Sequence, residues 1–148
     1  MKEYINTDMV VSTAEASITE CDKTRILVVD DQKTVRDVFK LLITYELPEC
    51  RVDLAENGAE AVDLFKKEHD GILLMDLHMP VMDGQTAFHE IEKICMLEHC
   101  KMPAVLFCTG YQPPNGLNKV IENSEHGLLL KPVSGDKLVA EIRKRMVA

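Results

Sequence analysis

The chain has 148 residues, of which 46% are hydrophobic and 28% charged, and its formal net charge is −8. This length suits one domain, and the composition is typical of a soluble globular protein. The excess of acid argues against sequence-independent binding of nucleic acid, which needs clustered Lys and Arg. No apolar run approaches the roughly 20 residues that span a bilayer, and residues 1–22 lack the pattern of a secretory signal. We therefore expect a cytoplasmic protein that does not bind membranes.

Five cysteines are present, and an odd number in a cytosolic chain favours free thiols over a disulfide framework. Cys95, His99 and Cys100 are close in sequence, but no second ligand pair has the spacing of a zinc site. We interpret these three residues as part of a helix face.

Short apolar runs and helical patterns alternate five times along the chain. Residues 1–23 lack a sustained period and are expected to form a partly ordered extension, with one short helix at 12–20; the domain itself is expected at 24–148. We predict strands at 26–29, 51–55, 71–75, 103–108 and 127–130, and helices at 33–46, 59–68, 85–99, from 113 onward and at the carboxyl terminus. The alternation predicts an α/β domain with a parallel sheet and helices on both faces.

Polar residues follow four of the predicted strands at the point where each one ends. They are Asp30 and Asp31 after the first strand, Asp76 after the third, Thr109 after the fourth and Lys131 after the fifth. Because ligand sites of such sheets lie at the carboxyl ends of the strands, we expect these side chains to share one pocket. Each could instead be a helix cap or a turn residue, but that explanation requires four coincidences at one edge of the sheet.

The chemistry of this pocket points to phosphoryl transfer. Clustered carboxylates repel one another unless a cation joins them, and hard oxygen ligands suit Mg²⁺. The ammonium of Lys131 and the hydroxyl of Thr109 suit the oxygens of a phosphoryl group, and an aspartate can accept phosphate covalently. Asp76 is the most central candidate acceptor.

The pattern resembles the receiver domain of response regulators over about residues 24–148. The resemblance rests on the run ILVVDD at 26–31, on LLMDLHMPVMDG at 73–84, on Thr109 and on Lys131-Pro132. It implies a doubly wound (βα)5 flavodoxin-like fold, a three-layer sandwich whose five-stranded parallel sheet has the order 2-1-3-4-5.

The resemblance also implies a role for each site residue. Asp76 would accept the phosphoryl group, and Asp30, Asp31, Asp76 and the backbone carbonyl of His78 would hold Mg²⁺. Thr109 and Lys131 would bind phosphoryl oxygens. The donor would be the phosphohistidine of a sensor histidine kinase or a phosphotransfer protein, and the chain would catalyse only its own phosphorylation and dephosphorylation.

Four positions near the site are unusual. Leu128, three residues before the lysine, replaces the Tyr or Phe that is frequent in the family, which puts the usual threonine–aromatic coupling in doubt. Gly110 follows the threonine where Ala is common and leaves room near the site. His78 and Tyr111 are bulky neighbours that could obstruct water, so we predict a long-lived phosphoryl group.

Output is expected through protein binding, on the face formed by the helix from 113, the strand 127–130 and the last helix. A downstream protein or a second copy of the chain could bind there.

Two alternatives remain: a receiver module cut from a larger hybrid kinase, and a docking domain that is never phosphorylated. An aspartyl-phosphate hydrolase would need an Asp two residues after the nucleophile, where this chain has His78. A flavin-binding module would need a Ser-, Thr- or Gly-rich loop after the first strand, where it has acids.

Overall fold

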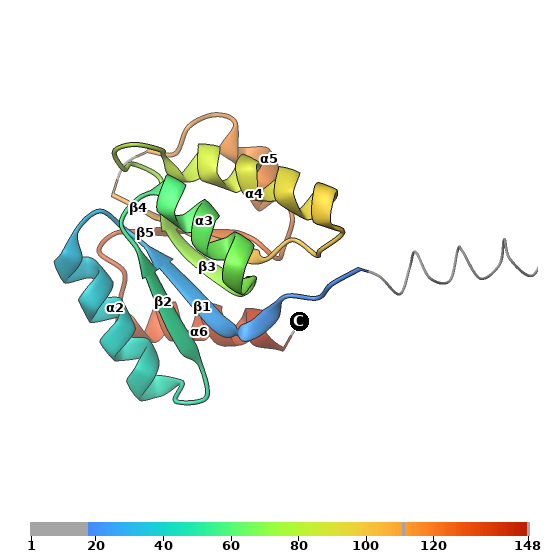
Figure 1. The fold of residues 1–148 in the computed structure, drawn as a ribbon. Helices are drawn as coiled ribbons and strands as arrows, with labels where there is room; N and C mark the ends of the chain where they lie inside the picture. Colours follow the sequence, from blue (N-terminus) through green and yellow to red (C-terminus); the bar gives the residue numbers. More distant parts are fainter. Residues whose placement is uncertain (1–17, 111, 148) are drawn as a thin grey trace, which may run out of the picture.

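A parallel sheet lies between two layers of helices in the computed structural model, which describes residues 18–110 and 112–147 (Figure 1). The strands are β1 (Asp22–Val29), β2 (Arg51–Ala55), β3 (Asp70–Asp76), β4 (Ala104–Thr109) and β5 (Gly127–Leu130). The helices are α2 (Lys33–Glu46), α3 (Gly58–Glu68), α4 (Gly84–Glu98), α5 (Leu117–Ile121) and α6 (Gly135–Met146). All neighbouring strands are parallel, and the order β2-β1-β3-β4-β5 confirms the predicted doubly wound fold.

Two hydrophobic clusters separate the sheet from its two helical layers. Helices α2 and α6 cover one face, where Ile43 and Ile142 are fully buried, and α3, α4 and α5 cover the other, where Phe65 and Ile91 are fully buried. Every residue of β3 and β4 is buried, which explains why these strands are apolar on both faces rather than alternating. The central strand β3 therefore carries Asp76 to the middle of the sheet edge.

Side chains in the connecting loops fix where the helices begin. Asn57 caps α3, Asp83 caps α4 and Ser134 caps α6, each by accepting a hydrogen bond from a backbone N–H in the first turn. Helices α3 and α4 end at His69 and His99, whose left-handed backbone closes the last turn. The residues at which these helices begin and end set the lengths of the loops at the two edges of the sheet.

The structure near the amino-terminal end of β1 differs from the prediction. Strand β1 begins at Asp22, before the predicted domain boundary, and Thr19 pairs with Cys100 in an isolated parallel bridge. The N–H of Thr19 donates to His99 O at 2.9 Å, and the N–H of Lys101 donates to Thr19 O at 2.8 Å. Most of the helix predicted at 12–20 lies outside the described residues, and residues 18–20 are not helical.

The helix predicted from Pro113 was wrong at its start. Helix α5 begins at Leu117 and has only five residues. A residue that precedes proline is disfavoured in the helical region, so Pro113 cannot begin a helix when Pro114 follows. The N–H of Leu117 instead donates to Pro114 O in a turn before the helix.

The two ends of the described chain lie at the same edge of the sheet (Figure 1). Thr19 lies beside the residues that precede β4, and Arg145, in the last turn of α6, donates to the carbonyl oxygen of Glu125 just before β5. Both contacts are at the amino-terminal ends of the strands. Within the described part of the chain, no helix combines the length and the apolar character needed to cross a membrane.

Candidate functional site

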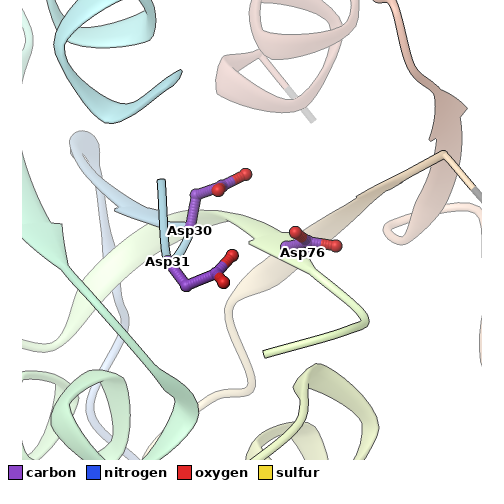
Figure 2. A group of neighbouring side chains, drawn as sticks. All are labelled: Asp30, Asp31 and Asp76. Carbon is purple, nitrogen blue, oxygen red and sulfur yellow. The ribbon is translucent and has the colours of Figure 1, made fainter. Parts of the chain in front are cut away.

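Three carboxylates meet where β1 and β3 end. Asp30 and Asp31 follow β1, and Asp76 is the last residue of β3, its neighbour in the sheet. One oxygen of each carboxylate lies within 4.8 Å of the others (Figure 2). Asp30 and Asp76 are 2% and 8% exposed, whereas Asp31 is exposed. The cluster is therefore anchored in the protein on one side and open to solvent on the other.

Hydrogen bonds hold the N–H, the carbonyl oxygen and the carboxylate of Asp30 in place. Its N–H donates to Ala55 O of β2 at 3.1 Å, and its Oδ1 accepts the N–H of Gln32 at 2.9 Å. Arg36 in α2 reaches back so that its Nη1 donates to Asp30 O at 2.7 Å. These bonds hold the carboxylate at the start of α2 rather than leaving it free in a loop.

Lys131 joins two of the carboxylates from the end of β5. Its Nζ lies 2.7 Å from Asp30 Oδ2 and 3.2 Å from Asp76 Oδ2. Burial pulls the pKa of Lys131 down, but the hydrogen bonds and negative charges of Asp30 and Asp76 outweigh burial and leave this pKa above its usual value. Lys131 is therefore a cation at neutral pH.

Thr109 is held next to this lysine. It is fully buried at the end of β4, and its carbonyl oxygen accepts the N–H of Lys131 at 2.8 Å. Parallel pairing sets Thr109 opposite Leu130, which brings the ends of β4 and β5 to the same level as the end of β3. The structure thus gathers Asp30, Asp76 and Lys131 at one edge, with Thr109 beside them.

The loop after β3 folds back tightly over Asp76. A Cβ on Gly84 would lie 2.3 Å from Asp76 O, so only glycine fits at this close approach. The N–H of Gly84 donates to Leu77 O at 3.1 Å, and the N–H of His78 donates to Asp76 Oδ1 at 3.2 Å. The His78 side chain is exposed, and the metal-binding role of its carbonyl stays a prediction.

The donor set fits a hard divalent cation. Three carboxylates and one ammonium leave a formal local charge of about −2, and all the acidic donors are oxygen atoms close enough to share one ion. The acidic group that could hold such an ion is Asp30, Asp31 and Asp76.

Besides His78, two more of the four unusual positions can be placed in the structure. Leu128 is half-buried and packs against the core on the α3, α4 and α5 face, opposite Phe107 of β4. A Cβ on Gly110 would come no closer than 4.0 Å to Lys131 Cβ, so the space expected beside this residue is present. Tyr111 lies outside the described residues.

Two residues beside the site, Arg36 and Cys108, were missed in the sequence, and the role of a third, Gly84, was not foreseen. Arg36 contacts the backbone of Asp30, and its position on the exposed-looking flank of a helix gave no signal. Gly84 was identified only as part of a motif, and its close approach to Asp76 depends on the folded loop. Cys108 lies opposite Asp76 in the β3–β4 pairing, where burial raises the pKa of its thiol to about 12.

Comparison with known proteins agrees with this geometry. Residues 26–143 match the family model of the response regulator receiver domain. The chemotaxis protein CheY of Bacillus subtilis is 30% identical over 122 residues, which cover 82% of this chain and 97% of CheY. The transcriptional regulatory protein YdfI of the same organism is 35% identical over 114 residues, which cover 77% of this chain and 51% of YdfI.

Solved structures show the same fold. A response regulator receiver domain protein from Clostridium thermocellum has a TM-score of 0.71 at 24% identity, covering 83% of this chain and 94% of that one. The response regulator domain of Thermotoga maritima CheB has a TM-score of 0.69 at 25% identity, covering 84% and 96%. The match over 26–143, together with the carboxylate cluster beside a lysine, shows that the chain belongs to the response regulator receiver domain family.

Proposed function

We propose that Asp76 accepts a phosphoryl group from the phosphohistidine of a sensor histidine kinase or a phosphotransfer protein. The observation that carries this proposal is the position of Lys131 Nζ, which bridges Asp30 and Asp76 within the carboxylate cluster. An ammonium at this point can hold a phosphoryl oxygen without moving far from its present partners. The protein is thus a cytoplasmic signalling protein of a two-component pathway, and it acts on no separate substrate.

The transfer requires few groups. The P–N bond of the phosphohistidine breaks as a P–O bond to an Asp76 carboxylate oxygen forms. The imidazole, protonated on its other ring nitrogen, leaves as a neutral ring with the electron pair of the broken bond. Lys131 would offset the charge of the phosphoryl oxygens, and the hydroxyl of Thr109 would bind one of them. Bound Mg²⁺, held by Asp30, Asp31, Asp76 and the carbonyl of His78, would supply further neutralisation of that charge.

The surface beside Lys131 suits a protein donor. A surface cavity of about 480 Å³ runs from Lys131 and Pro132 to Val38 on α2. Val38, Leu41 and Tyr45 are 60%, 73% and 81% exposed at helical spacing, and an apolar stripe of this kind is typical of a protein interface. We place the phosphohistidine-bearing protein on this stripe.

Output is placed on the face formed by α5, β5 and α6, where a downstream protein or a second copy of the chain would bind. Its candidate contacts Lys119, Glu122, Asn123 and Lys144 are exposed. The half-buried Leu128 leaves this face without the usual aromatic residue, so movement there would depend on Thr109 and Lys131. A receiver module of a larger hybrid kinase would use the same site, whereas a docking domain that is never phosphorylated would not.

Intact-mass spectrometry after incubation with acetyl phosphate tests the proposal. We expect the unmodified chain to gain one phosphoryl group only when Mg²⁺ is present, and Asp76→Asn to gain none. Asp83→Asn is the matched control, because asparagine can still cap α4 and the phosphoacceptor is intact. No adduct on the unmodified chain would refute the phosphoacceptor role and favour the docking domain. The decay of the adduct measures its lifetime, which we expect to be long.

A further inference from the structure

Sulfur donors gather around a cavity far from the carboxylate cluster. The cavity has a volume of about 490 Å³ and lies beside the second half of α4. Five of its seven lining residues are soft or borderline metal ligands: two thiols, two thioethers and an imidazole, from Cys95, Cys100, Met96, Met102 and His89. The proposed phosphoryl transfer uses none of them.

The end of α4 brings two of the thiols together. His99 has φ of 53°, and this left-handed residue lets the N–H of Cys100 donate to Cys95 O at 3.1 Å. Cys95 and Cys100 line the same cavity, and each residue is 7% exposed. An apolar contact between these two positions is usual at such a helix end, and here both positions carry a thiol.

A third thiol reaches the same place from the other end of the chain. Cys21 Sγ donates to Lys101 O at 2.9 Å, and Cys95 Sγ contacts the same oxygen at 3.7 Å. The pairing of Thr19 with Cys100 holds this segment beside the turn. Two cysteines that are 74 positions apart in the sequence, Cys21 and Cys95, therefore contact one peptide carbonyl, and Cys100 directly precedes the residue that carries it.

Burial keeps these thiols protonated, which makes them poor redox nucleophiles and means that a cation must displace their protons to bind. Burial, and to a lesser extent the neighbouring Cys100, raises the pKa of Cys21 to about 12 and raises that of Cys95 as well. Both are neutral thiols at physiological pH and are poor nucleophiles toward peroxides or disulfides. A thiophilic cation can still bind them, because it displaces the thiol protons.

We propose that Cys95 and Cys100 bind one Cu(I) ion, with Cys21 as an available third thiol. Two S–H bonds break, two S–Cu bonds form and two protons are released to solvent, with no change of oxidation state. Cu(I) is favoured over Zn²⁺ because it prefers soft sulfur ligands, whereas structural zinc needs four. Among the described residues, Asp30, Asp31 and Asp76 are the group that brings three ligand atoms within 4.8 Å of one another. The three thiols are farther apart than this, so we assign the ion to two of them.

Anaerobic competition with the Cu(I)–bicinchoninate complex tests the site. The unmodified chain should remove one equivalent of Cu(I), seen as a loss of the visible absorbance of the complex, and the double variant Cys95→Ser/Cys100→Ser should remove none. Cys50→Ser is the matched control, because Cys50 is a lone thiol whose Sγ lies 3.9 Å from Met146 Sδ. It should bind as the unmodified chain does. No uptake by the unmodified chain, or equal uptake by the double variant, would overturn the proposal.

A second measurement needs no variant and so does not depend on the folding of one. Cu(I) should protect Cys95 and Cys100 from alkylation by iodoacetamide, mapped by peptide mass spectrometry, and should leave the alkylation rate of Cys50 unchanged. Affinity should rise by about a hundredfold per pH unit, because two protons are released for each ion bound. Protection confined to Cys50, or uptake that does not change with pH, contradicts the assignment.

Discussion

Replacing His126 should reveal a buried hydrogen bond that ties β4 to the corner before β5. His126 is 7% exposed, its Nδ1 accepts the N–H of Val105 at 3.0 Å, and its ring meets Phe88 edge-on at 5.1 Å. Because Nδ1 accepts, the neutral ring carries its proton on Nε2. Alanine would leave a buried N–H without an acceptor and remove the ring contact, at a cost of about 2–4 kcal/mol. Asparagine should cost less, because its Oδ1 can take the place of Nδ1.

The same bond gives His126 a defined pH dependence. Burial lowers the pKa of His126, and the positive charge of Arg145 lowers it further. The negative charges of Glu125 and Glu92 raise this pKa but offset the decrease only in part. The unfolded chain, with a pKa near 6.5, therefore binds the proton more readily than the folded one. The stabilisation by His126 is complete above this value and is lost as the pH falls below it, by at most about 1.4 kcal/mol per pH unit.

Urea unfolding followed by circular dichroism can measure this difference. The free energy of unfolding of the unmodified chain minus that of His126→Asn should shrink between about pH 7.5 and about pH 5.5, since only the unmodified chain can titrate here. Taking the difference cancels the other titrating groups. A constant difference across this range would show that the hydrogen bond to Val105 does not depend on the proton, and the reasoning would be refuted.

Three further predictions concern other parts of the molecule. Gly84→Ala should lower stability by about 1–3 kcal/mol and reduce phosphorylation by acetyl phosphate, because its Cβ would overlap Asp76 O; a variant with normal stability and labelling would contradict the close approach. Burial and the nearby carboxylate of Asp53 raise the pKa of Asp70 to about 7. The folded protein therefore loses stability as the pH rises from 3.8 to about 7, because the unfolded chain ionises this residue first. Over that pH range, the free energy of unfolding of Asp70→Asn, measured in urea, should rise relative to that of the unmodified chain. Leu41→Ser should slow phosphoryl transfer from a purified phosphohistidine donor by about tenfold without changing labelling by acetyl phosphate. Leu97 on α4 is 81% exposed, against 73% for Leu41, and Leu97→Ser should change neither reaction; equal effects of the two substitutions would argue against the α2 stripe.

The sheet and the polar edge could be predicted from the sequence because both depend on local patterns. Buried parallel strands are short apolar runs, and a polar residue at the end of a run marks the sheet edge. Asp30, Asp76 and Lys131 needed only the strand order to become neighbours, and that order came from the family resemblance. Their contacts within 3.2 Å agree with the expected shared pocket.

Features that depend on contacts between distant segments could not be predicted. The bridge between Thr19 and Cys100 is a single residue pair, too short to leave a periodic pattern. The convergence of Cys21 on the end of α4 follows from that bridge, so the cysteines looked unrelated in sequence. Helix α5 was misplaced for a different reason: the tolerance of proline in a first turn was considered, but the restriction that Pro114 imposes on Pro113 was not.

The edge of the sheet that carries Thr19 and the last turn of α6 also determines how the domain can be joined to other chains. Both described ends lie at the amino-terminal ends of the strands (Figure 1). The carboxylates follow the carboxyl-terminal ends of β1 and β3, at the opposite edge of the sheet. A fluorescent protein or an immobilisation tag joined directly before Ile18 or after Val147 would therefore attach at the edge of the sheet opposite Asp76. The same geometry would let one unchanged receiver be combined with many different neighbours.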